Sequence, residues 1–161
     1  EIKECDWSSD VCSSDLNVAA GVGPYFREAH EGRGSAAGDL DGDGDVDLVI
    51  SRMNQPVALL KNTTKSSNHW LSLKLMGRES PRLPIGTVVK VTTGTKTQVR
   101  QVKGGTSFAS TVDPRLCFGL GKAESISSVE IAWPSGQVQQ IPLLAMNRAW
   151  VIREGQDPVP E

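Results

Sequence analysis

Hydrophobic and polar residues alternate along most of the second half of the chain, which is the pattern of β-strands that bury one face. In the clearest segment Leu71, Leu73 and Leu75 fall on one face and the intervening polar residues fall on the other. No stretch shows sustained helical periodicity with capping residues, so the pattern predicts an all-β protein. The predicted strands are residues 69–76, 85–93, 96–103, 128–133, 137–141 and 149–153.

Turn and linker signals divide the chain around these strands. Residues 61–68 are almost all polar and indicate an exposed linker, and residues 134–136 form a short hairpin connection. Gly119 and Gly121 flank Leu120 in a way that suits a bulge. Residues 156–161 contain two prolines and are predicted to be a tail.

Charge and apolar run length exclude two classes of partner. The 161-residue chain carries a net charge of −2 at pH 7, whereas nucleic-acid and membrane-surface binders use a clustered basic face. The longest apolar run, residues 141–146, contains a proline and is far too short for a membrane-spanning helix. We therefore expect no nucleic-acid partner and no membrane span.

The first sixteen residues differ from everything that follows. They hold Cys5 and Cys12 and a near-repeat of Ser-Ser-Asp, and they lack the apolar region and cleavage site of a signal peptide. The segment resembles translated sequencing-adapter sequence, so residues 1–16 are interpreted as a non-native leader; a native loop closed by a disulfide is the alternative. Without this segment Cys117 is the only cysteine, which excludes a disulfide framework and a cysteine metal site.

Five aspartates occupy alternate positions between residues 39 and 47. Carboxylates at this density repel one another unless a cation neutralises them. Ca²⁺ suits such a set because it takes about six to eight oxygen ligands in flexible geometry. The spacing also puts Gly44 where a sharp turn is needed, and Asp45 is expected to offer its backbone carbonyl. The predicted metal ligands are Asp39, Asp41, Asp43, Asp45 and Asp47.

Other interpretations of the acidic segment were weighed against calcium. An EF-hand loop requires a bidentate Glu at its twelfth position, where this chain has Ile50, and a strand-like sequence follows instead of a helix. The EF-hand interpretation therefore fails. Magnesium, a solvated acidic turn that binds no ion, and a catalytic role for the carboxylates stay open as alternatives.

The acidic segment resembles the calcium loop of FG-GAP and VCBS repeats in integrin-type β-propellers. There a D-x-D-x-D-G-x-x-D motif connects two strands of a blade, and Leu48, Val49 and Ile50 match the strand that follows it. The resemblance implies that residues 17–65 are the C-terminal part of a calcium-binding propeller blade, with further blades upstream. Without those blades we expect apolar surface to be exposed around Val49, Leu59 and Leu60.

The C-terminal half of the chain resembles an ASPIC/UnbV domain, which follows FG-GAP-type repeats in the cartilage acidic protein-like family and in many bacterial secreted proteins. Two positions depart from the family pattern: Cys117 stands where His is usual, and Thr87 where Ala is usual. Cys117 is predicted to be an inert buried thiol. The resemblance implies a small antiparallel β-sandwich-like module over residues 66–155. The matching blocks are residues 68–77, 85–86, 104–110, 113–121 and 129–136.

Together the two resemblances imply a fragment of a secreted, calcium-binding protein that presents its surfaces to a protein or glycan in adhesion or scaffolding. We expect a secreted, periplasmic or cell-surface location. His30 and His69 have no partner at metal-ligand spacing, and no nucleophile elbow or P-loop occurs, so no enzyme activity is expected. Two alternatives stay open: an accessory protein of enediyne-type secondary-metabolite biosynthesis, and the non-catalytic end of a carbohydrate-active enzyme.

Overall fold

The structure is a computed structural model that describes residues 21, 23–105, 109–111 and 113–161. The chain divides into two compact units, Glu1–Glu31 and Gly32–Glu161. In the first unit, the described part includes η1 (Pro24–Arg27), which is one turn of 3₁₀ helix. The predicted leader and the two cysteines within it lie outside the described residues.

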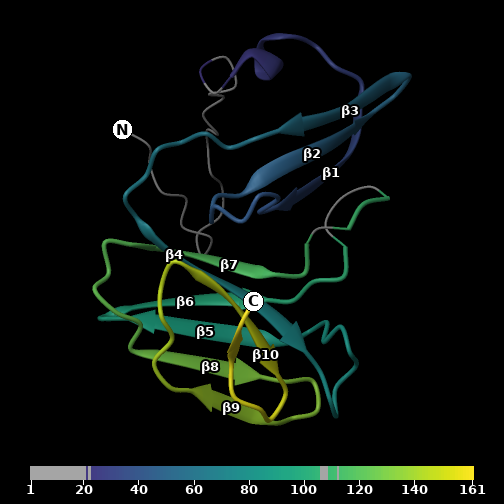
Figure 1. The fold of residues 1–161 in the computed structure, drawn as a ribbon. Helices are drawn as coiled ribbons and strands as arrows, with labels where there is room; N and C mark the ends of the chain where they lie inside the picture. The colour runs from purple at the N-terminus through teal and green to yellow at the C-terminus, as the bar shows by residue number, and fades with distance from the viewer. Residues whose placement is uncertain (1–20, 22, 106–108, 112) are drawn as a thin grey trace, which may run out of the picture. The chain divides into compact units, whose positions relative to one another are not determined.

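Every regular element in the described part of the second unit is a β-strand, which confirms the all-β prediction (Figure 1). The strands are β1 (Gly32–Gly38), β2 (Asp47–Arg52), β3 (Gln55–Leu60), β4 (His69–Met76), β5 (Val88–Thr93), β6 (Lys96–Gln101), β7 (Leu116–Gly121), β8 (Ser128–Ala132), β9 (Val138–Ile141), β10 (Arg148–Arg153) and β11 (Val159–Pro160). They form three sheets, with the orders β1-β2-β3, β11-β10-β4-β7 and β6-β5-β8-β9.

The first sheet is antiparallel and carries the acidic segment at one end. Gly38 pairs with Asp47, so the segment is the connection between β1 and β2. Leu59 lies on the edge strand β3 and is 64% exposed, in line with the apolar surface expected there. Val49, on the central strand, and Leu60, on the opposite face of β3, are half-buried instead.

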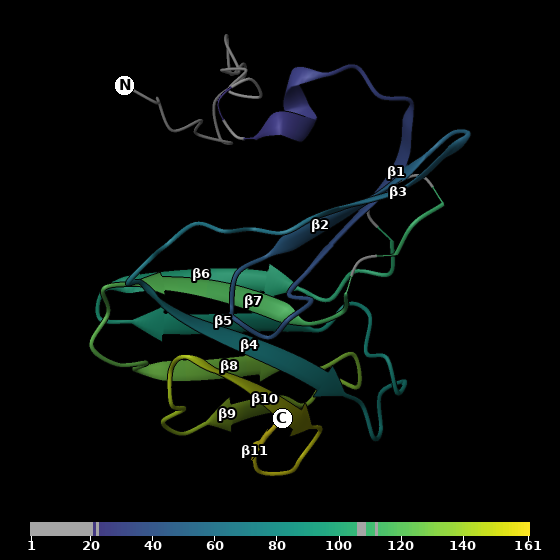
Figure 2. The same ribbon diagram turned by 45° about the horizontal axis from the view of Figure 1, so that its top comes forward.

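The two four-stranded sheets form a sandwich around one hydrophobic core (Figure 2). The alternation in β4 has the predicted effect, because Leu71, Leu73 and Leu75 are all buried in this core. The opposing sheet contributes alternate valines and isoleucines from its central strands. They are Val89, Val91, Val129 and Ile131.

The sandwich is not wholly antiparallel, which corrects the expectation from the sequence. β10 runs parallel to β4, and Leu71 pairs with Arg148, 77 positions later. Parallel neighbours need a long connection, and here the connection is the rest of the sandwich. β7 pairs with the other edge of β4 in the antiparallel sense, so β4 lies in the middle of its sheet.

Local irregularities explain where the strands begin and end. β5 starts at Val88 and not at residue 85, because Gly86 has a φ of 95° and the buried Thr87 donates its hydroxyl to the Pro84 carbonyl in a turn. The pairing of β4 with β7 shifts register at Leu120, which confirms the predicted bulge. The predicted tail contains the short strand β11, which pairs with β10.

Among the described residues, no helix combines the length and the apolar character needed to cross a membrane.

Candidate metal centre

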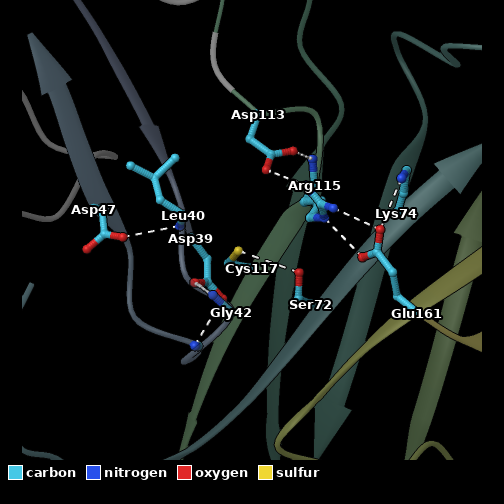
Figure 3. A network of polar contacts seen from close by, with 11 residues as sticks. Asp39, Leu40, Gly42, Asp47, Ser72, Lys74, Asp113, Arg115, Cys117 and Glu161 are labelled. Atoms are coloured by element: carbon cyan, nitrogen blue, oxygen red, sulfur yellow. Dashed lines mark hydrogen bonds and ion pairs between the residues drawn. The ribbon is translucent and has the colours of Figure 1, made fainter. Parts of the chain in front are cut away.

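Aspartate side chains within the loop between β1 and β2 accept hydrogen bonds from the loop backbone and stabilise its conformation. Asp39 accepts hydrogen bonds from the backbone N–H groups of Gly42 (2.7 Å) and Gly44 (3.0 Å), the first of which is drawn in Figure 3. The Asp45 N–H donates to Asp43 Oδ1 at 2.9 Å. Both glycines have positive φ, 78° for Gly42 and 91° for Gly44, which bends the chain around the Asp39 carboxylate.

Three of the five predicted ligands come together in this loop. The carboxylates of Asp39, Asp41 and Asp43 each offer an oxygen, and these atoms lie within 4.8 Å of one another. Asp41 and Asp43 are exposed and Asp39 is half-buried, so the group faces solvent. Asp45 and Asp47 do not belong to this group.

Asp47 has a structural role at the base of the loop. Its side chain is 3% exposed, and each oxygen accepts one backbone hydrogen bond, from Leu40 at 3.1 Å and from Asn62 at 2.8 Å. Asp47 therefore ties the start of the loop and the segment after β3 to the start of β2. Its role as a metal ligand stays a prediction.

Lys61 supplies a positive charge to the loop. Its ammonium donates a hydrogen bond to Asp41 and lies 3.8 Å from Asp43. The hydrogen bond from Lys61 lowers the pKa of Asp41, and the same contact raises the pKa of Lys61. The ammonium lies where a cation is electrostatically favoured, so the three carboxylates fit a hard oxygen-preferring cation such as Ca²⁺.

The loop is also packed against the sandwich. A Cβ atom added to Gly44 would lie 2.2 Å from the Trp70 indole, so the loop backbone rests directly on a side chain of β4. Where β1 enters the loop, a Cβ added to Gly38 would lie 3.0 Å from the Cβ of Asp113. The position of the acidic loop is thus coupled to β4 and to the segment before β7.

A charged network surrounds that second contact (Figure 3). Arg115 binds Asp113 at 2.7 Å and Glu161 at 2.8 Å, and Lys74 binds Glu161 at 3.0 Å. The hydrogen bond from Arg115, with a smaller contribution from Lys74, lowers the pKa of Glu161 to about 2. The network joins β4, the start of β7 and residue 161.

Cys117 is half-buried in β7. Its sulfur lies 3.8 Å from the hydroxyl of Ser72, and burial raises the pKa of the thiol. A raised pKa keeps the sulfur protonated near neutral pH and therefore poorly nucleophilic, in line with the predicted inert thiol.

Sequence reasoning missed Lys61 and Asn147. Lys61 is one of several charged residues near the polar linker, and nothing in the local pattern distinguishes it. Asn147 binds His69 and the backbone of Trp70, which lie 78 and 77 positions earlier in the sequence, and these contacts depend on the parallel pairing of β10 with β4.

Comparison with known proteins supports the resemblance of the C-terminal half to an ASPIC/UnbV domain. Residues 77–159 match the family described as ASPIC and UnbV. The chain is 35% identical over 139 residues to cartilage acidic protein 1 of Xenopus tropicalis, which covers 81% of this chain and 20% of that protein. It is 34% identical over 138 residues to the proteins of the same name from Mus musculus and Homo sapiens, covering 80% of this chain and 20% and 19% of those proteins. The chain thus spans about one fifth of the length of these relatives. Because the family match extends over more than half of its residues, this chain belongs to the ASPIC and UnbV family.

Proposed function

We propose that this chain is a calcium-binding module of a secreted protein that acts in adhesion or scaffolding, by presenting β-sheet surfaces to a protein or glycan. The observation that carries the proposal is the convergence of Asp39, Asp41 and Asp43, whose carboxylate oxygens lie within 4.8 Å of one another. The loop resembles that of FG-GAP repeats, and the relatives are named for cartilage, which supports an extracellular location.

Calcium would supply charge neutralisation and cross-linking in this loop. Backbone hydrogen bonds to Asp39 stabilise the loop conformation, while Asp41 and Asp43 are exposed and both lie close to the Lys61 ammonium. Gly44 packs against the Trp70 side chain of β4. An ion that makes the loop more rigid would therefore also make the contact between the first sheet and the sandwich more rigid. This arrangement suits a module whose surfaces must keep a fixed geometry for a partner.

Calcium is expected to raise the melting temperature of the chain by about 10 °C. An ion present at about one hundred times its Kd, and bound only by the folded state, adds about 2.7 kcal/mol to the free energy of unfolding. For a Kd of about 10⁻⁴ M, the tight end of the extracellular class, that excess corresponds to about 10 mM CaCl₂. The measurement is calorimetry in EDTA and in increasing CaCl₂.

The variant Asp43→Asn should lose this shift, while Asp157→Asn, which changes an exposed carboxylate outside the loop, should keep it. An equal shift in both variants would contradict a site in the loop. Equal stabilisation by MgCl₂ would replace calcium by magnesium, and no shift with either ion would favour the solvated turn.

Replacing Lys61 by Met is expected to tighten calcium binding by about two- to fivefold, because the ammonium competes with the ion for Asp41 and Asp43. Isothermal titration calorimetry of wild type and Lys61→Met measures the two Kd values. Lys65→Met, in the exposed linker that follows, is the matched control and should leave the affinity unchanged. Weaker binding by Lys61→Met would show that the lysine supports the site and does not compete for it.

A further inference from the structure

A cleft of about 490 Å³ lies between the acidic loop, the start of β4 and the turn before β10. This volume is in the range of small-molecule sites, about 300–1,000 Å³. Its polar and aromatic lining comes from three parts of the second unit that are distant in sequence. The side chains that matter are Asp43, Asp45, Asn68, His69, Trp70 and Asn147.

Asn147 holds one wall of the cleft in a fixed arrangement. Its backbone N–H donates to the Trp70 carbonyl at 2.7 Å, and its Oδ1 accepts the Trp70 N–H at 3.2 Å. Asn147 also has a φ of 55°, a left-handed conformation that Asn tolerates better than most residues but that still costs free energy. Strained residues of this kind cluster at binding sites, where the surrounding contacts hold them.

The same residue contacts the ring of His69. His69 Nδ1 lies 2.9 Å from Nδ2 and 3.2 Å from Oδ1 of Asn147, so a hydrogen bond joins the two side chains whichever ring nitrogen carries the proton. His69 and Asn147 therefore give the cleft a polar wall, and the amide of Asn68 and the two loop carboxylates line it as well.

This lining selects among ligand classes. None of the described residues that line the cleft is Lys or Arg, and two are carboxylates, so phosphate, sulfate and carboxylate ligands are disfavoured. Trp70 is the one large apolar side chain among them, too little to bury an apolar ligand. Planar amide, carboxylate and imidazole groups beside an indole match a ligand with many hydroxyls and a partly apolar ring.

We propose that this cleft binds a neutral saccharide. The inference rests on the proposed function, since it makes a glycan the partner of the module and since an ion held by Asp39, Asp41 and Asp43 would offset the negative charge on the loop side of the cleft. An unloaded loop would instead attract a cationic ligand. Saccharide binding should therefore require calcium, whereas binding of a cationic ligand should occur only without it.

The test uses the full chain with saturating CaCl₂ and an array of neutral oligosaccharides of glucose, galactose, mannose, fucose and N-acetylglucosamine, with sulfated oligosaccharides alongside. We expect binding to neutral members. The affinity for the best neutral binder, measured by calorimetry, should fall about tenfold or more in Asn147→Gly, which removes the amide that holds the wall. Asn54→Gly is the matched control, because Asn54 has the same φ of 55° but lies in the turn between β2 and β3.

Asn68→Ala is the second variant, because it changes an exposed linker side chain and should also weaken binding. The proposal is overturned if no neutral saccharide binds to protein that still shows its calcium-dependent melting shift, and that outcome leaves the proposed calcium function intact. Binding of sulfated members only, or equal affinity in Asn54→Gly and Asn147→Gly, would also overturn it. So would binding of spermidine in EDTA with no saccharide binding in calcium.

Discussion

Replacing Glu154 by Ala is expected to lower the free energy of unfolding by about 4 kcal/mol, because it strips a buried site of its acceptor. Glu154 is 2% exposed and accepts hydrogen bonds from the backbone N–H groups of Arg78 (2.8 Å) and Ser80 (2.7 Å). The hydroxyls of Ser80 and Ser135 donate to its other oxygen. Removal of the carboxylate leaves four buried or half-buried donors without their partner.

Urea unfolding of the variant and of Glu124→Ala measures this effect, since Glu124 is an exposed carboxylate. Glu124→Ala should change the stability by less than about 0.5 kcal/mol. A loss below about 1 kcal/mol in Glu154→Ala would show that water replaces the carboxylate in the folded state.

The pH dependence provides a second readout for Glu154. Burial raises its pKa, but the hydrogen bonds from Ser135, Ser80 and Arg78 outweigh burial and lower the pKa from 4.5 to about 2. A carboxylate whose pKa is lower in the folded state adds stability above the unfolded pKa, and this contribution is lost as the pH falls. The stability difference between wild type and Glu154→Ala should therefore be full above pH 4.5 and shrink between pH 4.5 and about 2. The difference isolates Glu154 from Glu161, whose pKa is lowered over the same range.

Gly44→Ala is expected to cost about 3 kcal/mol and to displace the loop from β4. The new methyl group would lie 2.2 Å from the Trp70 indole, and the backbone has a φ of 91°. Overpacking of about 1–3 kcal/mol adds to about 1–2 kcal/mol for the backbone conformation. The measurement is the melting temperature together with the indole N–H resonance of Trp70, which should shift.

Gly42→Ala separates the two causes. Gly42 has a similar φ of 78°, yet a Cβ added there meets nothing within 4 Å. This variant should show the backbone cost alone, about 1 kcal/mol, and leave the Trp70 resonance in place. If the two alanine variants behaved alike, the contact with Trp70 would contribute nothing.

The sequence predicts the faces of the strands better than their partners. The alternation in β4 places Leu71, Leu73 and Leu75 in the core because a period of two defines a face by itself. The same pattern contains no information about which strand lies beside which. The parallel pairing of β4 with β10 therefore became evident only from the structure.

The acidic loop shows the same limit at the level of single residues. Alternate spacing groups Asp39, Asp41 and Asp43, since neighbours two apart in a tight loop converge. It does not separate them from Asp47, whose burial depends on the return of the chain at Asn62. Likewise, the positive φ of Asn147 has no signature in the alternation of the flanking residues.

The position of β10 has a consequence for the order in which the chain can fold. The first sheet joins strands that follow one another directly, so it can form early and locally. One edge of β4, in contrast, has no partner until β10 has been synthesised, 77 positions later. During that interval an apolar strand presents unpaired backbone groups, which is the template for pairing between chains. Aggregation during biosynthesis should therefore depend on how quickly residues 148–153 follow β4 out of the ribosome.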